Sequence, residues 1–339
     1  MRPERDTLLR TSVRCVHGLM AASALLFTAA CAAGEPAKAG QTADPAPSPF
    51  HEGQIIDTAT GQVVSPDELI SRLLRQEVIY LGEEHHNQFH IEAAHRVLTS
   101  LASRGRRPVL AMEMFGWDGQ DVLNRYLSPQ GVSREDFLDQ VRWQQNWGGP
   151  FEDYEPLVRF AKVQRLPLVA LNPPKNLVRS VAKQGLEQAR QTPEMVQWGM
   201  QDEQIIEDPV YRARILQQLR ACHDGGPDAM YRTMYEASMV RDEGMAKTIV
   251  SQVRRLRAGS DRSEGPVVSY TGGGHIQFNL PVPKRVARRL DNEVQQASLY
   301  MTSFEKDRLV ELQDMLREKI ADYVWLTAVS AQGPPRRCR

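Results

Sequence analysis

Four short apolar runs, with helical spacing between them, constrain the fold of this chain more than any other feature. The runs lie at 77–81, 108–114, 166–171 and 266–270. They are nearly continuous rather than alternating, which is typical of parallel strands covered on both faces. Residues 87–103 and 153–164 lie between the first three runs and place apolar side chains on one helical face. The pattern predicts an α/β fold with a mainly parallel sheet and flanking helices.

The remainder of the chain divides into segments of different character. Residues 175–259 contain no strand pattern, so they predict a smaller helical subdomain inserted into the α/β domain. Further on, strands are expected at 297–302 and 322–327, with a helix at 305–319 between them. The predicted organisation is a signal peptide at 1–30, a flexible tether at 31–50, an α/β domain at 51–174 and 260–328, the helical subdomain at 175–259, and a disordered tail at 329–339.

The first residues have the pattern of a secretory leader, with a short apolar run at 18–30 and small residues before Cys31. The basic residues ahead of the run are Arg2, Arg5, Arg10 and Arg14. The run is shorter than the roughly 20 apolar residues that cross a bilayer. Residues 28–31, Thr-Ala-Ala-Cys, resemble a lipobox, so either Cys31 is acylated as a membrane anchor or the leader is an ordinary cleaved signal. Ala32 in place of Asp favours the outer membrane, and we expect a lipid-anchored protein of the bacterial cell envelope that faces the periplasm.

Composition argues against several classes of protein. Lysine plus arginine and aspartate plus glutamate number 42 each, and this zero net charge speaks against nucleic acid as the main partner. Four cysteines are too few for a disulfide scaffold, and whether Cys222 pairs with Cys338 stays open. The sequence contains no P-loop, no Rossmann fingerprint and no Gly-x-Ser-x-Gly elbow.

Glutamate and histidine side chains occur where the predicted strands end. Ligands bind beyond the carboxyl ends of the strands in open α/β sheets. These ends, called the rim below, supply Glu83, His85, Glu113, Asn172 and His275. Glu113 interrupts an otherwise apolar strand, and it needs a partner because burying a lone charge is costly. Gly272 and Gly273 would let the backbone approach a bound cofactor closely.

The rim residues are compatible with three kinds of chemistry. Their carboxylates and imidazoles could hold a divalent transition metal, with Glu83, His85, Glu113 and His275 as the ligands. The same groups could act as an acid–base pair that activates water, or as donors and acceptors in a binding pocket. A structural alternative has Glu83 capping the following helix and the histidines packing as partly buried groups.

Two other patterns are ambiguous in function. The spacing of His86 and His90 matches part of a zinc-binding helix motif without its inner glutamate, so we expect the pair to lie on a solvated helix face. Residues 230–245 are rich in methionine and tyrosine, which usually form core. They could instead line a pocket for a large flat apolar ligand, because a tyrosine oxygen can ligate haem iron. The same alternatives hold for an aromatic group that comprises Trp143, Trp147, Phe151 and Tyr154.

Stretches spread over residues 55–328 carry a family likeness. They are 80–87, 111–115, 154–160, 166–172, 234–245, 270–276 and 322–327. On these stretches the chain resembles the ChaN-like haem-binding lipoproteins of the Tiki/TraB/erythromycin-esterase-like superfamily. The first superfamily motif falls on Gly82, Glu83 and His85, the second on Gly272 and His275, and the carboxylate of the second strand on Glu113.

The resemblance implies a large α/β domain, a small helical domain and, as in one branch of the family, haem that is bound with the help of dimerisation. The iron ligand in one branch of the family is a tyrosine, for which Tyr154, Tyr231 and Tyr235 are the candidates here. Other branches of the superfamily are hydrolases, and they use the glutamate and histidine residues of the rim.

These observations leave three hypotheses for function. The first is a lipoprotein that binds haem or iron for uptake or holding, with the membrane and haem-uptake machinery as its partners. The second is a metal-dependent hydrolase, in which the rim glutamates and histidines hold a divalent transition metal or polarise water. The third is a non-catalytic lipoprotein that binds another ligand.

Overall fold

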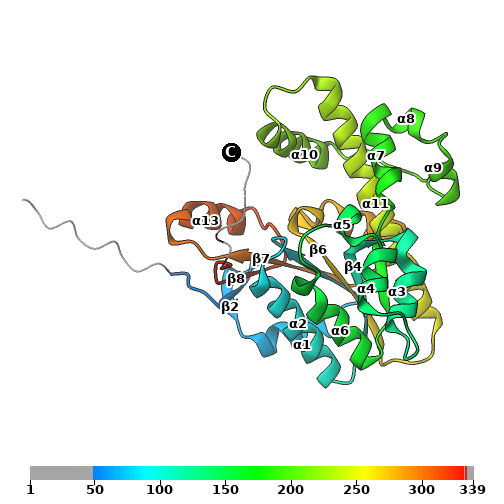
Figure 1. Ribbon diagram of the computed structural model, residues 1–339. Coiled ribbons are helices and arrows are strands. Elements are labelled where there is room, and N and C mark those ends of the chain that lie inside the picture. Colours follow the sequence, from blue (N-terminus) through cyan, green and yellow to red (C-terminus); the bar gives the residue numbers. More distant parts are fainter. Residues whose placement is uncertain (1–48, 332, 334–339) are drawn as a thin grey trace, which may run out of the picture. The chain divides into compact units, whose positions relative to one another are not determined.

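A computed structural model of the chain describes residues 49–331 and 333. In this part of the chain eight strands form one sheet, in the order β2-β1-β8-β7-β3-β6-β4-β5 (Figure 1). Neighbouring strands from β8 to β5 are parallel, whereas β1 runs antiparallel to both β2 and β8. The strands are β1 (Ile55–Asp57), β2 (Gln62–Val64), β3 (Val78–Glu83), β4 (Arg107–Gly116), β5 (Leu168–Asn172), β6 (Glu264–Gly272), β7 (Gln296–Ser303) and β8 (Tyr323–Thr327). The predicted mainly parallel α/β fold is confirmed.

Helices cover both faces of the sheet, which accounts for the continuous apolar runs. In β3, Ile79 and Leu81 join a core with residues of α2 and α6, while Val78 and Tyr80 join a second core with residues of α11 and α12. The helices are α1 (Pro66–Leu73), α2 (Gln88–Ser103), α3 (Gln120–Leu127), α4 (Arg134–Gln140), α5 (Trp143–Asn146), α6 (Glu155–Gln164), α7 (Lys175–Gln184), α8 (Leu186–Ala189), α9 (Pro193–Gln197), α10 (Pro209–Cys222), α11 (Asp228–Ala258), α12 (Val282–Arg289) and α13 (Leu309–Arg317).

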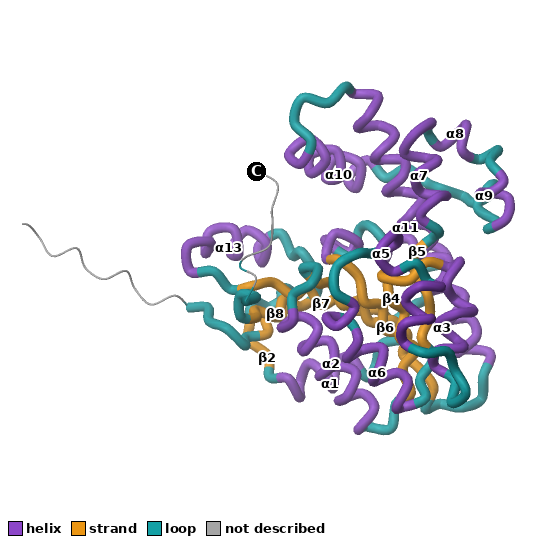
Figure 2. Tube along the Cα trace, in the orientation of Figure 1, coloured by secondary structure: helices purple, strands orange, loops and turns teal. Residues whose placement is uncertain are grey.

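The segment between β5 and β6 is helical throughout its described secondary structure, as its sequence predicts. Helices α7 to α10 lie beyond the end of β5, whereas the long helix α11 extends back toward the sheet (Figure 2). The outer part of the segment has its own small core, which includes Leu177, Val181, Met195 and Val240. The division of the chain into domains stays a prediction.

A short loop, residues 84–87, separates Glu83 at the end of β3 from helix α2. Its N-cap is Asn87, whose side chain accepts the N–H of Phe89 at 3.0 Å. The structural alternative in which Glu83 caps this helix is therefore wrong, and Glu83 is free for another role.

The remaining predictions on the fold differ from the structure in detail. The helix expected at 305–319 is shorter, since α13 ends at Arg317 and a 3-10 turn precedes it. Strands β1 and β2 were not predicted, because each has three residues, which are too few to show an apolar pattern. The predicted leader, Cys31, most of the tether, and Cys338 with most of the tail lie outside the described residues. None of the described helices is long and apolar enough to span a membrane.

Candidate functional site

The rim forms where β3, β6, β4 and β5 lie side by side in the sheet. Glu83 ends β3 and Gly272 ends β6, and these two residues are register partners. Glu113 lies in β4 where the register with β5 shifts between Met112 and Gly116. Irregularities of this kind re-aim a side chain. The carboxylate of Glu113 accordingly reaches β6, where it accepts the N–H of Gly272 at 2.7 Å.

Glu83 and His85 form the first carboxylate–imidazole pair, with 2.8 Å between Oε1 of Glu83 and Nδ1 of His85. Glu83 also accepts hydrogen bonds from the hydroxyls of Tyr154, at 2.9 Å, and Tyr270, at 2.5 Å. The Tyr154 oxygen accepts the N–H of His86 at 3.0 Å, so its single proton is directed to Glu83. Glu83 is therefore surrounded by donors, which makes Nδ1 the protonated nitrogen of His85 when Glu83 is ionised.

The surroundings shift the pKa values of this pair. Burial raises the pKa of Glu83 against the opposing hydrogen bonds of its neighbours. Burial lowers the pKa of His85, but the hydrogen bond to Glu83 and the charges of Glu113 and Glu83 outweigh it, so that pKa is raised. The His85 side chain is 45% exposed and meets Trp147 edge-on, with 4.8 Å between ring centroids. Its Nε2 makes no hydrogen bond with the described residues, so this nitrogen is open to a ligand.

Glu113 and His275 form the second pair, with 3.3 Å between Oε1 of Glu113 and Nε2 of His275. Arg241 also donates to Glu113, at 2.7 Å. The other nitrogen of His275 lies 2.5 Å from Asp242, whose second oxygen accepts from Tyr211 at 2.6 Å. Burial lowers the pKa of His275, but the charges of Glu113 and Asp242 outweigh it and raise the pKa to about 9. Burial raises the pKa of Glu113, but the charges of His275 and Arg241 outweigh it and hold the pKa well below 4.5.

Gly272 lies between the two pairs, next to His85 of the first pair and Glu113 of the second. A Cβ at this position would lie 2.7 Å from Cε1 of His85 and 3.6 Å from Oε2 of Glu113. A Cβ at Gly273 would lie 2.5 Å from the ring of Tyr300. We predicted that Gly272 and Gly273 allow a close approach of a cofactor. In the structure, their missing side chains make room for rings of the protein itself.

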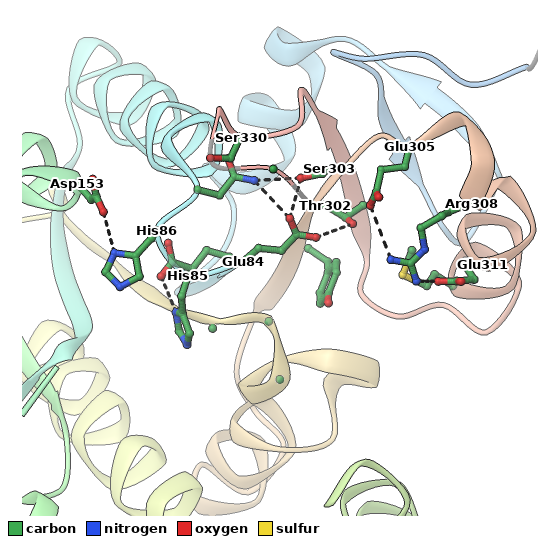
Figure 3. A pocket seen from close by; sticks show the side chains of 18 of the residues that line it. Glu84, His85, His86, Asp153, Thr302, Ser303, Glu305, Arg308, Glu311 and Ser330 are labelled. Atoms are coloured by element: carbon green, nitrogen blue, oxygen red, sulfur yellow. Dashed lines mark hydrogen bonds and ion pairs between the residues drawn. The ribbon is translucent and has the colours of Figure 1, made fainter. Parts of the chain in front are cut away.

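A cavity of about 910 Å³ opens at the rim, within the range of roughly 300–1,000 Å³ that is usual for ligand pockets. Figure 3 shows that His85 and His86 come from the loop after β3, while Thr302 and Ser303 come from the end of β7. Carboxylates dominate the charged lining, which contains Glu83, Glu84, Asp153, Glu305 and Glu311 beside Arg308.

The two histidines of the partial zinc motif do not share a helix face. His86 precedes α2 with a φ of 62°, and its Nδ1 lies 2.7 Å from Asp153 in the cavity wall (Figure 3). His90 is completely buried, and burial lowers its pKa to about 4. The expectation that this pair lies on a solvated helix face is therefore wrong.

The three tyrosines proposed as iron ligands lie in different surroundings. Tyr154 is completely buried behind Glu83. The hydroxyl of Tyr231 bonds to the backbone of the loop that precedes α11. Tyr235 packs against Tyr211, with 5.8 Å between ring centroids, and burial raises its pKa to about 12. The wall of the rim cavity includes none of the three.

The four side chains predicted as metal ligands form two carboxylate–imidazole pairs, one joined by a hydrogen bond and the other by an ion-pair contact of 3.3 Å. Across residues 49–331 and 333, no group of three or more histidine, cysteine, aspartate or glutamate side chains is arranged to hold a metal ion. Each imidazole of the set lies beside one carboxylate, an arrangement that can hold or transfer a proton.

Sequence reasoning missed three partners of these pairs. Arg241 and Asp242 stand with Glu243 in an otherwise apolar turn of α11, and three adjacent charges in a buried helix were the available signal. Tyr270 occupies an apolar strand position, and no pattern there distinguishes a hydrogen-bonding tyrosine from a packing one.

Known proteins resemble the chain in sequence and in fold. Residues 69–286 match the family model described as haem-binding uptake, Tiki superfamily, ChaN. The fold is similar to that of ChaN from Campylobacter jejuni, solved with cofacial haem binding, at a TM-score of 0.60 and 17% identity over 80% of this chain and 96% of that chain. The erythromycin esterase EreC matches at a TM-score of 0.43 and 13% identity, over 74% of this chain and 76% of that chain.

One curated relative comes from a plant. It is the chloroplastic protein RETICULATA-RELATED 5 of Arabidopsis thaliana, which is 22% identical over 293 residues, covering 79% of this chain and 36% of that protein. The chain thus spans about a third of the length of this relative.

Proposed function

The chain belongs to the ChaN family of haem-binding uptake proteins in the Tiki superfamily, and on that premise we propose that it binds haem or iron in the rim cavity for uptake or holding. His85 is the iron ligand in this proposal. One observation carries it: Nδ1 of His85 is held by the buried Glu83, while Nε2 makes no hydrogen bond with the described residues and its ring lines a cavity of about 910 Å³.

This arrangement of His85 fits the ligation of iron. A histidine that binds a metal commonly donates its other N–H to a carboxylate, which fixes the ring and raises its basicity. Glu83 supplies that carboxylate, and two tyrosine hydroxyls hold it in place. His86 repeats the arrangement with Asp153 beside it. Bound haem would supply an iron centre whose reactivity depends on its axial ligand and the polarity of its pocket.

The tyrosine candidates fit this role less well. Tyr154 is buried, and its one proton is engaged by Glu83. Burial and the charge of Glu83 raise the pKa of Tyr154, which disfavours the phenolate that binds iron. We therefore assign Tyr154 to holding Glu83, and through it His85.

Haem titration of the purified protein tests the proposal. We expect a saturable Soret band that shifts or disappears in His85→Ala, compared per folded molecule because the substitution also removes a hydrogen-bond partner of the buried Glu83. The control is His95→Ala, because His95 lies on α2 and packs against Phe160 outside the rim cavity. A wild-type protein without saturable haem binding, or a His85→Ala variant identical to wild type, would refute the assignment.

A hydrolase is the second candidate, and the opposite pKa shifts of the two buried glutamates favour it. The pKa of Glu83 is raised and that of Glu113 is lowered. Paired groups whose surroundings separate their pKa values are suited to acid and base roles. In this hypothesis His85 activates water, either alone or beside a divalent metal. Ester turnover that is lost in His85→Gln, measured together with metal analysis of the purified protein, would favour it over haem binding.

We further propose that the protein is anchored through acylated Cys31 in the outer membrane, faces the periplasm, and works with haem-uptake machinery as a homodimer. The leader pattern at 1–30 and the Thr-Ala-Ala-Cys sequence at 28–31 support the anchor. The homodimer and the uptake machinery rest on membership of the ChaN family. Detergent phase partitioning of wild type and Cys31→Ser tests the anchor. Recovery of both proteins in the aqueous phase would contradict it.

A further inference from the structure

A second cavity adjoins the rim and differs from the first in the charge of its lining. It measures about 230 Å³, and Glu113 forms part of its wall. Three basic side chains line it, namely Lys175, Arg179 and Arg241. Besides Glu113, Asp118 is the carboxylate among its lining residues. From these contacts we propose that this cavity is a subsite for a small oxyanion, the carboxylate or phosphate group of a ligand.

The basic side chains come from two elements that meet at this place. Lys175 and Arg179 lie one turn apart on α7, and Arg241 comes from α11. Burial lowers the pKa of Lys175, and the positive charges of Arg179 and Arg241 lower it further. The three cations therefore repel one another across the cavity, and an anion between them would relieve that repulsion.

The donors in this cavity are only partly used by the protein. Arg241 is engaged by Glu113 at 2.7 Å and by Asn172 at 3.1 Å. Lys175 donates to backbone carbonyls of the α5 segment. Arg179 makes no hydrogen bond or ion pair with the rest of the described chain. Its guanidinium is therefore available for a carboxylate or phosphate, which it can hold with two parallel hydrogen bonds.

The start of α7 adds to the same field. Its N-cap is Pro174, which provides no side-chain cap, and Pro173, Lys175 and Val178 line the cavity. The first N–H groups of a helix lack partners within the helix and favour an anion. The helix start thus supports the basic side chains, which remain the principal recognition elements.

The subsite lies next to the cavity that is proposed to hold the ligand of His85. Glu113 lines the second cavity, while its hydrogen-bond partner Gly272 lines the first. The two cavities are therefore neighbours, and a ligand that reaches both would place an anionic group in the basic one. A free small anion could equally occupy the subsite alone. These two sources, the ligand's own anionic group and a free anion, share the same oxyanion chemistry.

Calorimetric titration with inorganic phosphate tests the subsite without haem. We expect saturable binding that weakens about tenfold or more in Arg179→Ala, since hydrogen bonds between charged groups are the strong ones. Lys183→Ala is the matched control, because Lys183 is exposed one turn further along α7 and does not line this cavity. Equal loss in both variants would show a general charge effect and overturn the subsite.

A second experiment separates the two sources and rests on the proposed function. Haem and its dimethyl ester are titrated into wild type and Arg179→Ala. If the dimethyl ester binds more weakly than haem to wild type but not to Arg179→Ala, the result supports the subsite. The anion is then the ligand's own carboxylate, even if inorganic phosphate alone does not bind. If Arg179→Ala changes neither phosphate binding nor the difference in affinity between haem and its dimethyl ester, the subsite is refuted. Failure of haem binding alone refutes only the proposed function, because the phosphate titration still decides the subsite.

Discussion

The charge on His275 should make the stability of this protein depend on pH in a defined window. His275 lies between Glu113 and Asp242, which raise its pKa to about 9 from an ordinary value of 6.5. A group with a raised pKa in the folded state stabilises the fold fully below the unfolded value and loses that effect as pH rises through the folded value. The stabilisation should therefore be complete below pH 6.5 and lost as pH rises to about 9. Each pKa unit corresponds to about 1.4 kcal/mol, so about 3 kcal/mol is at stake.

Urea unfolding at pH 6, 7.5 and 9 measures this contribution, and urea is preferred because a salt denaturant would screen the charges. We expect the free energy of unfolding of wild type to fall by about 3 kcal/mol more than that of His275→Gln over this range. His95→Gln, on the surface of α2, should retain the wild-type pH dependence. Parallel curves for wild type and His275→Gln would refute the reasoning, because they would show that His275 is not held protonated by its two carboxylates.

Two further substitutions test the packing and charge of the buried network. Gly272→Ala places a Cβ 2.7 Å from the His85 ring, so it should weaken haem binding and lower the free energy of unfolding by about 1–3 kcal/mol. A Cβ at Gly274 meets nothing within 4 Å, so Gly274→Ala should leave the free energy of unfolding unchanged. Glu243→Gln removes the completely buried carboxylate that pairs with three arginines, and it should cost about 3–5 kcal/mol in urea unfolding, whereas the exposed Glu187→Gln should cost almost nothing. A neutral Gly272→Ala or Glu243→Gln would contradict the corresponding contact.

The sequence predicted those features that follow directly from the type of residue at a position. Continuous apolar runs predicted the parallel strands, because a strand that is buried on both faces has no polar side. The same reasoning singled out Glu113, since a carboxylate in such a strand requires a partner. It could not name Arg241 as that partner, because Arg241 lies on a helix that meets the strand only through the tertiary fold. The edge strands β1 and β2 escaped prediction for a different reason, their short length.

The histidines show how local context misleads. The spacing of His86 and His90 suggested one helix face, but α2 begins only at Gln88, after the cap at Asn87. His86 therefore lies in the loop, and His90 enters the core. The role of Gly272 was inaccessible for a similar reason. A glycine before a histidine suggests ligand approach, whereas the space at Gly272 is filled by His85, which is distant in the sequence.

Stability alone does not explain the buried second pair. Replacing a buried ion pair by apolar residues is often neutral or stabilising, so Glu113 and His275 need another justification. Glu113 holds the N–H of Gly272, and the His85 ring lies against Gly272, so the second pair supports the position of the first. A binding protein needs that geometry but not the charge. Glu113→Gln can still accept the Gly272 N–H through its amide oxygen, so haem affinity per folded molecule should persist. A hydrolase that uses the charge of Glu113 would instead lose turnover in this variant, and the two assays on one protein therefore distinguish the two proposed functions.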